Sequence, residues 1–350
     1  MNIETLIFIL PKDKSMPSRY VRALYLNEFN TPGIKLQYID IPSICEPKGK
    51  TGKYILKLLL VPLQSVRIKK AMKDNKIAIM IKPDSPLLIL FLRILGLKII
   101  VDINDPIHLR LYSGRFAGLK FKAIMMISSF NIFESEEYLH YWGDKYINNS
   151  VVIEDTPQHV TKYNNYKERH NRIIWVGSPT TSKILLESSD CFESFYHCGV
   201  RDILLLGADT EVASEIAKIS KLRVQNIISY DIELLRKELS LSCYAFCPSN
   251  DSPLYALRGN LKAKIMMSHG CITFAKDIAM HRRLIDNGYN GFLFKTHKDI
   301  SDAFRTSLND QNRRIRIASN ANILTVEKYS PDNHLRQLLN LCSFVSSFGK

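Results

Sequence analysis

The sequence lacks the short motifs that mark several common enzyme classes. No Gly-x-Gly-x-x-Gly opens a βαβ pattern, which argues against a dinucleotide-dependent redox enzyme. No Gly-x-Ser-x-Gly is present, which removes the usual hydrolase elbow. Residues 48–53 read KGKTGK, but the first glycine that a Walker phosphate loop requires is replaced by Ile44. The chain therefore matches none of these three classes by motif.

Metal-binding cysteine patterns and long apolar runs are also missing. The seven cysteines are scattered, no CxxC occurs, and the nearest pair, Cys243 and Cys247, has three residues between. This spacing predicts reduced, mostly buried thiols, with neither a metal site nor disulfides. The longest apolar runs are interrupted by Lys57, Pro62 or Arg93, so none reaches the roughly 20 residues that span a bilayer. The N-terminus has an acidic residue and only a short apolar run, which predicts the first strand of a cytoplasmic protein.

The charge balance is strongly basic, with a net charge of +14. Such a balance predicts a polyanionic partner: nucleic acid, an anionic membrane surface or a phosphorylated substrate. Between Lys48 and Lys76 basic residues alternate with apolar ones, a composition that suits an anionic membrane surface and a peripheral location there. The alternative is a solvated lysine face on an ordinary packed helix. No nucleic-acid-binding module is recognisable, so we predict no nucleic-acid partner.

Short β-branched and apolar segments alternate with helical patterns through the first half of the chain. They lie at residues 6–10, 36–39, 77–81, 98–102, 123–127, 132–133 and 151–153, and a helix is predicted at 19–29. The alternation restarts at 173–176 and continues at 203–206, 224–228, 244–247 and 271–275. Two such series predict an α/β protein with two Rossmann-like domains and a cleft between them.

The 350-residue length favours two domains of roughly 150 residues. Residues 156–172 are polar with little apolar periodicity, so we interpret them as the linker. We predict an N-terminal domain at 1–165, a second domain at 166–330, and a C-terminal amphipathic helix within 331–350, after the break at Pro331.

In the first domain, polar side chains follow the buried strand at 99–101. Asp102, Asn104, Asp105 and His108 lie in the loop after it, and the carboxyl edge of an open α/β sheet is where ligands bind. Asp105 or Asp102 could orient or deprotonate a substrate hydroxyl, with His108 as a further candidate. For each of the three, a loop-capping or turn role is the alternative.

In the second domain, two segments have the chemistry of a phosphate site. A strand runs directly into Gly177 and Ser178, where a glycine lets backbone N–H groups approach a diphosphate and the Ser178 and Thr180 hydroxyls can contribute. A simple strand-to-helix turn is the alternative. From Ser249 to Phe294 the chain then displays arginine and lysine in a loop and a short helix beside a strand, as binding sites for phosphorylated ligands do.

These segments together resemble the GT-B type nucleotide-sugar glycosyltransferases, in particular glycosyltransferase family 4 and its relatives. The resemblance is carried by VDINDPIHLR, IIWVGSPTT, and the helix, strand and Asn-Gly turn between residues 258 and 294. It implies two Rossmann-like domains facing each other across a cleft, with the C-terminal helix packing back toward the N-terminal domain. It further implies a retaining transfer from a nucleotide sugar to a glycan or lipid-linked acceptor of bacterial-type surface polysaccharide synthesis, without metal or other cofactor. Arg258 and Lys262, with Lys264 nearby, would then meet the donor diphosphate.

Acidic residues that the family often carries are missing, since Leu257, Ile265 and Arg283 stand at their positions. In the family these acids hold the ribose and sugar hydroxyls of the donor. The alternative is therefore a catalytically weak or inactive member of the same fold that binds or scaffolds a polysaccharide-assembly complex.

Overall fold

The computed structural model describes residues 5–11, 17–29, 33–41, 50–104, 106, 117–157, 168–250 and 252–347. The described chain divides into two compact units. The first unit is built from Met1–Asp155, Leu257–Gly259 and Pro331–Lys350, and the second from Thr156–Ala256 and Asn260–Ser330. The predicted linker between domains overlaps residues 158–167, which lie outside the described residues.

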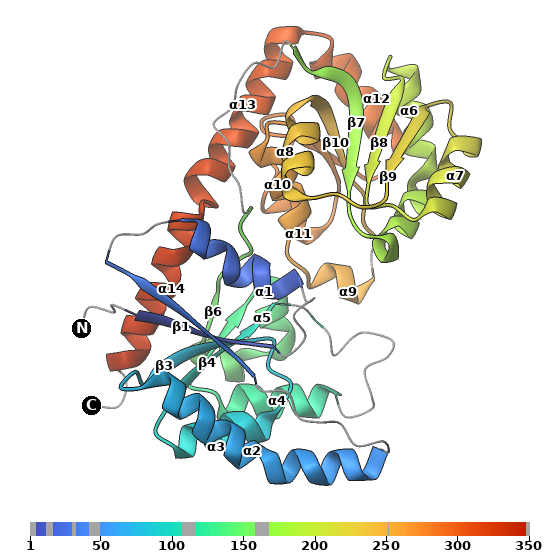
Figure 1. Cartoon of the computed structure of the whole chain (residues 1–350). Helices are drawn as coiled ribbons and strands as arrows, with labels where there is room; N and C mark the ends of the chain where they lie inside the picture. The colour runs from blue at the N-terminus through green and yellow to red at the C-terminus, as the bar shows by residue number, and fades with distance from the viewer. Residues whose placement is uncertain are drawn as a thin grey trace. The chain divides into compact units, whose positions relative to one another are not determined.

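The first unit contains a six-stranded sheet in the order β2-β1-β3-β4-β5-β6, with every neighbouring pair parallel (Figure 1). Its strands are β1 Thr5–Leu10, β2 Lys35–Asp40, β3 Ile77–Ile81, β4 Lys98–Ile103, β5 Phe130–Phe133 and β6 Ser150–Val152. The central strands β3 and β4 are mostly apolar and are buried after their first residue, as expected for a parallel sheet covered by helices on both sides.

The helices of the first unit differ from the prediction at two places. They are α1 Pro17–Arg22, the 3-10 helix η1 Leu24–Glu28, α2 Lys50–Met72, α3 Pro86–Ile94, α4 Ala117–Ile127, α5 Glu136–Trp142, the 3-10 helix η3 Asp144–Asn149 and α14 Pro331–Ser347. The single helix expected at 19–29 is interrupted at Ala23 and continues as η1. Residues 123–127, expected to continue the strand series, form the second half of α4. Their apolar run was ambiguous, because a buried helix segment and a buried strand share that pattern.

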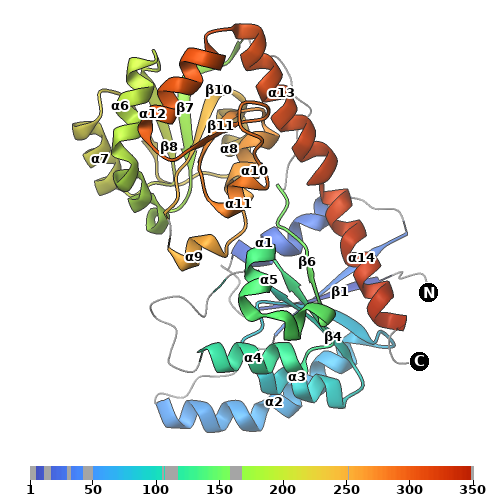
Figure 2. The same cartoon turned by 180° about the vertical axis from the view of Figure 1, so that it is seen from behind.

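The C-terminal helix α14 packs on the first unit, which confirms the prediction for this element (Figure 2). Its apolar residues Leu335, Leu338 and Cys342 are buried in the same cluster as strands β1, β3 and β4. The Lys98 ammonium at the start of β4 donates to two carbonyl oxygens near the helix end, each at 3.0 Å. A cation satisfying the last carbonyls of a helix is a favourable C-terminal arrangement.

The second unit repeats the architecture with a different strand order, β12-β11-β10-β7-β8-β9, again all parallel. Its strands are β7 His170–Val176, β8 Asp202–Leu206, β9 Arg223–Ile227, β10 Ser242–Cys247, β11 Ile272–Lys276 and β12 Phe292–Phe294. The order reverses between β7 and β10. Ligands of open α/β sheets bind at the carboxyl ends of the strands at such a reversal.

Helices cover both faces of the second sheet, giving two apolar clusters. They are the 3-10 helix η5 Pro179–Ser188, α6 Ser189–His197, α7 Thr210–Ile219, α8 Ile232–Ser240, α9 Pro253–Ala256, α10 Leu261–Ser268, α11 Ala279–Arg282, α12 His297–Ala303, the π-helical η6 Phe304–Leu308 and α13 Gln311–Lys328. One cluster is centred on the rings of Phe195, Phe274 and Phe304, which pack edge-to-face or stacked. The α/β class and both parallel sheets are therefore as predicted.

In the part of the chain that the structure describes, no helix is both long enough and apolar enough to cross a membrane. Those same residues contain no cluster of three or more His, Cys, Asp or Glu side chains that could hold a metal ion.

Candidate functional site

The loop that follows β7 is built around a tight hydrogen-bonded turn at the strand reversal of the second sheet. Ser178 caps η5, and its backbone N–H donates to Thr181 Oγ1 at 3.1 Å. The Thr181 hydroxyl in turn donates to the Ser178 carbonyl oxygen at 3.1 Å. The exposed Thr180 hydroxyl lies 3.0 Å from Ser178 Oγ. Three hydroxyl groups therefore cluster within four residues at the carboxyl edge of the sheet.

Two glycines allow this loop its close approach to the neighbouring strand. A Cβ at Gly177 would lie 2.2 Å from Cη2 of Trp175. A Cβ at Gly207, which follows β8, would lie 2.3 Å from the Gly177 carbonyl oxygen, and Gly207 has φ of +82°. That left-handed conformation favours glycine on its own account. The Tyr230 hydroxyl also donates to the Gly177 carbonyl at 3.2 Å, so the loop is held from several sides.

Lys262 on α10 brings a positive charge to this loop. Its Nζ donates to Thr181 Oγ1 at 3.1 Å and lies 5.2 Å from the centroid of the Trp175 ring. Three of the predicted donor-site residues, Gly177, Ser178 and Lys262, are thus brought together from positions about 85 residues apart. A half-buried lysine beside hydroxyl groups can bind an anion such as a phosphate.

Lys264, predicted to lie near the donor, is placed elsewhere. Its side chain is fully buried, and its Nζ lies 3.9 Å from the centroid of the Tyr329 ring. Residues two apart on a helix point to nearly opposite sides, so Lys262 reaches the edge of the sheet while Lys264 reaches the helix α13 side. Of the two lysines that make α10 basic, Lys262 therefore lies at the candidate site and Lys264 lies in the core.

Arg258 belongs to the first unit, whereas Lys262 belongs to the second. The short segment Leu257–Gly259 is anchored within the first unit by a hydrogen bond from Ser135 Oγ to the Leu257 carbonyl, at 2.9 Å. Gly259 packs closely on Glu134, since a Cβ at Gly259 would lie 2.2 Å from Glu134 Oε1. The Leu257 side chain is buried in the core of the same unit. The two predicted phosphate ligands are thus held by different parts of the fold.

At the carboxyl edge of the first sheet, Asp102 is buried and paired. Arg22 on α1 donates to both of its carboxylate oxygens, from Nε at 2.8 Å and from Nη2 at 3.0 Å. The same guanidinium donates to Asp155 Oδ1 at 2.7 Å and to the Ile153 carbonyl at 3.0 Å. Burial raises the pKa of Asp102 and the Arg22 charge opposes that rise, while the two carboxylates hold the pKa of Arg22 above its ordinary value.

The loop after β4 carries the other acceptor-side candidates. Asp105 and His108 lie outside the described residues. Asn104 is buried, and its Oδ1 has no hydrogen-bond partner among the residues that the structure describes.

Sequence reasoning missed two residues that organise these edges. Arg22 lies at the end of α1, which also contains Arg19, so charge alone does not single it out. His281 joins the ends of β10 and β11, with Nδ1 2.7 Å from the Lys276 carbonyl and Nε2 3.8 Å from Cys247 Sγ. Burial lowers the pKa of His281 to about 4 and raises the pKa of Cys247 to about 11, so both are neutral near pH 7.

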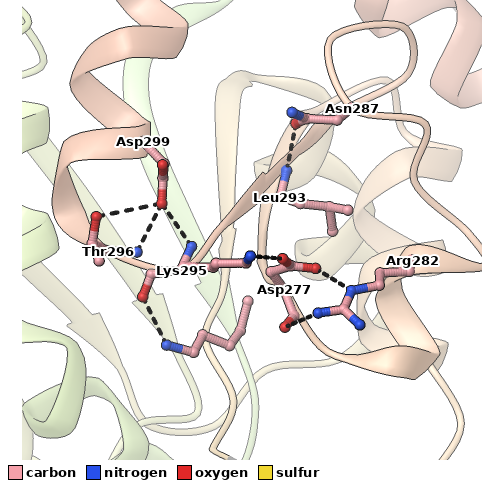
Figure 3. A network of polar contacts seen from close by, with 8 residues as sticks. Asp277, Arg282, Asn287, Leu293, Lys295, Thr296 and Asp299 are labelled. Carbon is pink, nitrogen blue, oxygen red and sulfur yellow. Dashed lines mark hydrogen bonds and ion pairs between the residues drawn. The ribbon is translucent and has the colours of Figure 1, made fainter.

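The loops after β11 and β12 are fixed by a polar network (Figure 3). Asp277 pairs with Arg282 at 2.5 Å and with Lys295 at 3.7 Å. Asp299 Oδ2 accepts from the backbone N–H groups of Lys295 and Thr296, each at 2.8 Å, which closes the cap of α12.

The Asn-Gly turn itself is structural. The buried Asn290 side chain accepts from the Asp286 backbone N–H at 2.8 Å and donates to the Leu284 carbonyl at 3.1 Å. A Cβ at Gly291 would lie 3.0 Å from the Thr273 carbonyl oxygen. The Asn-Gly turn therefore fixes the backbone at this edge of the sheet, and the Asn290 side chain is used within the turn itself.

Comparison with known proteins gives matches by structure alone. No family model matches the sequence, and no curated protein matches it. A glycosyltransferase from Rickettsia africae ESF-5 superimposes with a TM-score of 0.70 over 100% of both chains at 14% identity. Anabaena Alr3699/HepE in complex with UDP does so with a TM-score of 0.64 over 97% of this chain and 100% of that chain, at 11% identity. This chain has the GT-B fold.

A UDP-forming trehalose-phosphate synthase from Burkholderia vietnamiensis has the same fold, with a TM-score of 0.67 over 98% of this chain and all of that chain at 11% identity. TarM matches at 16% identity with a TM-score of 0.61, but 80% of this chain covers only 58% of TarM. The predicted α/β fold with two parallel sheets is therefore confirmed.

Proposed function

We propose that this protein is a glycosyltransferase that moves a sugar from a nucleoside-diphosphate donor to an acceptor hydroxyl. The observation that carries the proposal is the Lys262 ammonium on Thr181 Oγ1, beside the Gly177 loop, at the strand reversal of the second sheet. Further support comes from the shared GT-B fold with proteins whose structures hold UDP or a UDP-sugar. The donor phosphates would bind at this loop, with Ser178 and Thr180 adding hydroxyl contacts.

The chemistry needs stabilisation of a leaving diphosphate. Negative charge grows on the phosphate oxygens as the bond to the sugar breaks, and preorganised cations and N–H groups lower the energy of that state. Lys262 and the hydroxyl groups of Ser178 and Thr180 can supply this without a metal ion. We propose a metal-independent hexosyl transfer that retains anomeric configuration.

On the acceptor side we propose Asp105 as the group that orients or deprotonates the hydroxyl, with His108 as the second candidate. Asp102 suits this role less well, because Arg22 engages both of its carboxylate oxygens and a base must keep an oxygen for the incoming proton. Asp102 would then hold the start of the loop.

We further propose a glycan or lipid-linked acceptor of bacterial-type surface polysaccharide synthesis. The protein would work in the cytoplasm, at the inner face of the membrane. The basic stretch from Lys48 to Lys76 supports this location, since Arg67, Lys70 and Lys73 are exposed at the end of α2 and attract anionic headgroups.

Binding without transfer is the second candidate function. It is favoured by the apolar residues at positions where the resembling family carries acids: Leu257 is buried in the first unit and Ile265 packs against the core of the second. Arg283 at the third position is exposed. Such a protein would bind the nucleotide and hold a biosynthetic complex together.

Two measurements separate these functions. Thermal shift with a panel of nucleoside diphosphates should show stabilisation that grows with ligand concentration as RT ln(1 + [L]/Kd). Product analysis with nucleotide sugars and lipid-linked acceptors should then show transfer. If neither transfer nor donor hydrolysis occurs and Lys262→Ala binds nucleotide like the unmodified protein, the proposal fails. Stabilisation without any turnover would support the binding function.

A further inference from the structure

The helices α2, α3 and α4 form one layer on the first unit and leave many apolar side chains exposed. Of the fifteen large apolar residues that are exposed in the described part of the chain, seven lie on these three helices. The inner sides of all three pack into a single apolar cluster through residues such as Ile68, Leu92 and Ile124. Figures 1 and 2 both show the helices side by side, so their outer sides make one surface.

The exposed residues follow the helical repeat along each outer side. On α3, Leu87, Leu90 and Ile94 are spaced three and four apart, and Ile94 is 68% exposed. On α4, Leu119 and Met126 are 61% and 62% exposed and lie seven apart. Residues at such spacing lie on one face of a helix. Each helix therefore has an apolar stripe on its core side and a second one facing outward.

The charges among these stripes are of one sign. Lys70 on α2, Arg93 on α3, and Lys120 and Lys122 on α4 are exposed. Helices α3 and α4 contain no Asp or Glu, and neither does α2. Helices that combine outward apolar side chains with lysine and arginine as their only charged residues are complementary to a layer of anionic headgroups over hydrocarbon.

We infer that the outer side of α2, α3 and α4, which we term the α2–α4 face, binds the surface of an anionic lipid bilayer. Leu90, Ile94, Leu119 and Met126 enter the boundary between headgroups and acyl chains, and the surrounding lysines pair with phosphate groups. This deepens the membrane association included in the proposed function. In this inference the membrane contact is no longer the stretch from Lys48 to Lys76 by itself. The contact is the α2–α4 face, in which α3 and α4 provide the apolar residues.

A lipid layer fits this face better than a second copy of the chain. In a symmetric dimer the same patch meets itself, which would bring the lysines of α2 and α4 of both copies together without acidic partners on these helices. Headgroup phosphates neutralise those charges instead. The contact needs no spanning helix, because an interfacial helix lies in the plane of the membrane.

The apolar contribution is tested with the full chain and vesicles. The triple variant Ile94→Gln, Leu119→Gln, Met126→Gln should bind vesicles of mixed phosphatidylglycerol and phosphatidylcholine about 100-fold more weakly than the unmodified protein, because each half-inserted apolar side chain contributes about fivefold. The matched control is Ile219→Gln with Ile228→Gln, which removes apolar residues that are 54% and 57% exposed on the second unit. This control should bind vesicles unchanged.

The charge contribution is tested by Lys70→Glu with Lys122→Glu. Binding should fall by about 30-fold or more, because each lysine near an anionic surface contributes about fivefold. Lys218→Glu with Lys237→Glu, on exposed positions of α7 and α8, should have no such effect. The unmodified protein should also bind pure phosphatidylcholine vesicles far more weakly than mixed ones.

Equal binding by the triple variant and the unmodified protein would overturn the inference, as would equal binding to neutral and anionic vesicles. A concentration-dependent dimer that the triple variant abolishes, without any vesicle binding, would assign the face to self-association instead.

Far-UV circular dichroism shows whether each variant is folded, and thermal shift with a nucleoside diphosphate tests the donor site separately. Nucleotide stabilisation without vesicle binding would reject the membrane face while leaving the proposed transferase standing, and vesicle binding without nucleotide stabilisation would do the reverse.

Discussion

The carboxyl edge of each sheet holds one basic side chain, and the two basic side chains differ in their burial and in their hydrogen-bond partners. In the first unit, the Arg22 guanidinium is fully buried and bonded to Asp102 and Asp155. In the second unit, the Lys262 ammonium is only half-buried and rests on a neutral hydroxyl, that of Thr181. A cation enclosed between two carboxylates holds the fold together, whereas one that donates to a hydroxyl can turn to a stronger acceptor.

The largest expected effect is on stability, at the first edge. Arg22→Met should lower the free energy of unfolding by about 3–5 kcal/mol, because it leaves Asp102 and Asp155 buried without their cation. Denaturant unfolding followed by circular dichroism measures this. Arg67→Met, at an exposed position of α2, is the control and should change little.

Adding Asp102→Asn to Arg22→Met sharpens the test. Since the cost arises from uncompensated carboxylates, the second change should recover part of the lost stability. A double variant less stable than Arg22→Met alone would show that packing, and not charge, dominates this cluster.

The second prediction concerns pH and the second edge. Burial lowers the pKa of His281 and of His269 from 6.5 to about 4, so the unfolded chain takes up protons below pH 6.5 that the folded chain does not. Stability should therefore fall as pH drops from about 6.5 to about 4, by on the order of 3 kcal/mol per histidine. Unfolding free energies of the unmodified protein and of His281→Gln, measured across this range, should differ in slope. Parallel pH curves would contradict the prediction.

The third prediction separates the two lysines of α10. Lys262→Met should weaken binding of a nucleoside diphosphate by about 10- to 100-fold, since a hydrogen bond to a charged group contributes about 1.5–3 kcal/mol. Lys264→Met removes a buried ammonium beside Tyr329 and should leave nucleotide affinity unchanged. Isothermal titration calorimetry of both variants decides it: an equal loss in both would mean that affinity follows the stability of α10 rather than contact with the ligand.

The smallest effect is expected at the hydroxyl that Lys262 contacts. Thr181→Val removes the acceptor of the Ser178 N–H and of Lys262, and should cost about 0.5–1.5 kcal/mol in unfolding free energy. Nucleotide affinity should fall only a few-fold, because the cation remains. Thr210→Val, at the exposed start of α7, serves as the comparison in the same melts and titrations. A loss at Thr181 as large as that at Lys262 would mean that the loop, and not the charge, provides the binding energy.

Most strands and helices could be predicted from the order of apolar and polar residues within each segment. The wrong assignment arose where that order fits both a helix and a strand. Strands such as β3 and β10 are short, apolar and bounded by polar residues, which leaves little choice of structure. Residues 123–127 could not be assigned in the same way, because an apolar run reads alike in a buried helix and a buried strand. The loop at Gly177 and Ser178 was found because its glycine, hydroxyls and preceding strand are adjacent in the chain.

By itself, the sequence determined the two α/β series, the glycine loop after β7 and the C-terminal helix, because each depends on neighbouring residues and their periodicity. Only the tertiary structure decided which charges serve which purpose. It pairs Arg22 with Asp102 and Asp155, 80 and 133 positions away, and separates Lys262 from Lys264 by the turn of one helix. It also assembles the α2–α4 face from three successive helices whose outer sides lie next to one another. These outcomes depend on which side chains packing leaves inside, and a linear pattern of charge does not contain that information.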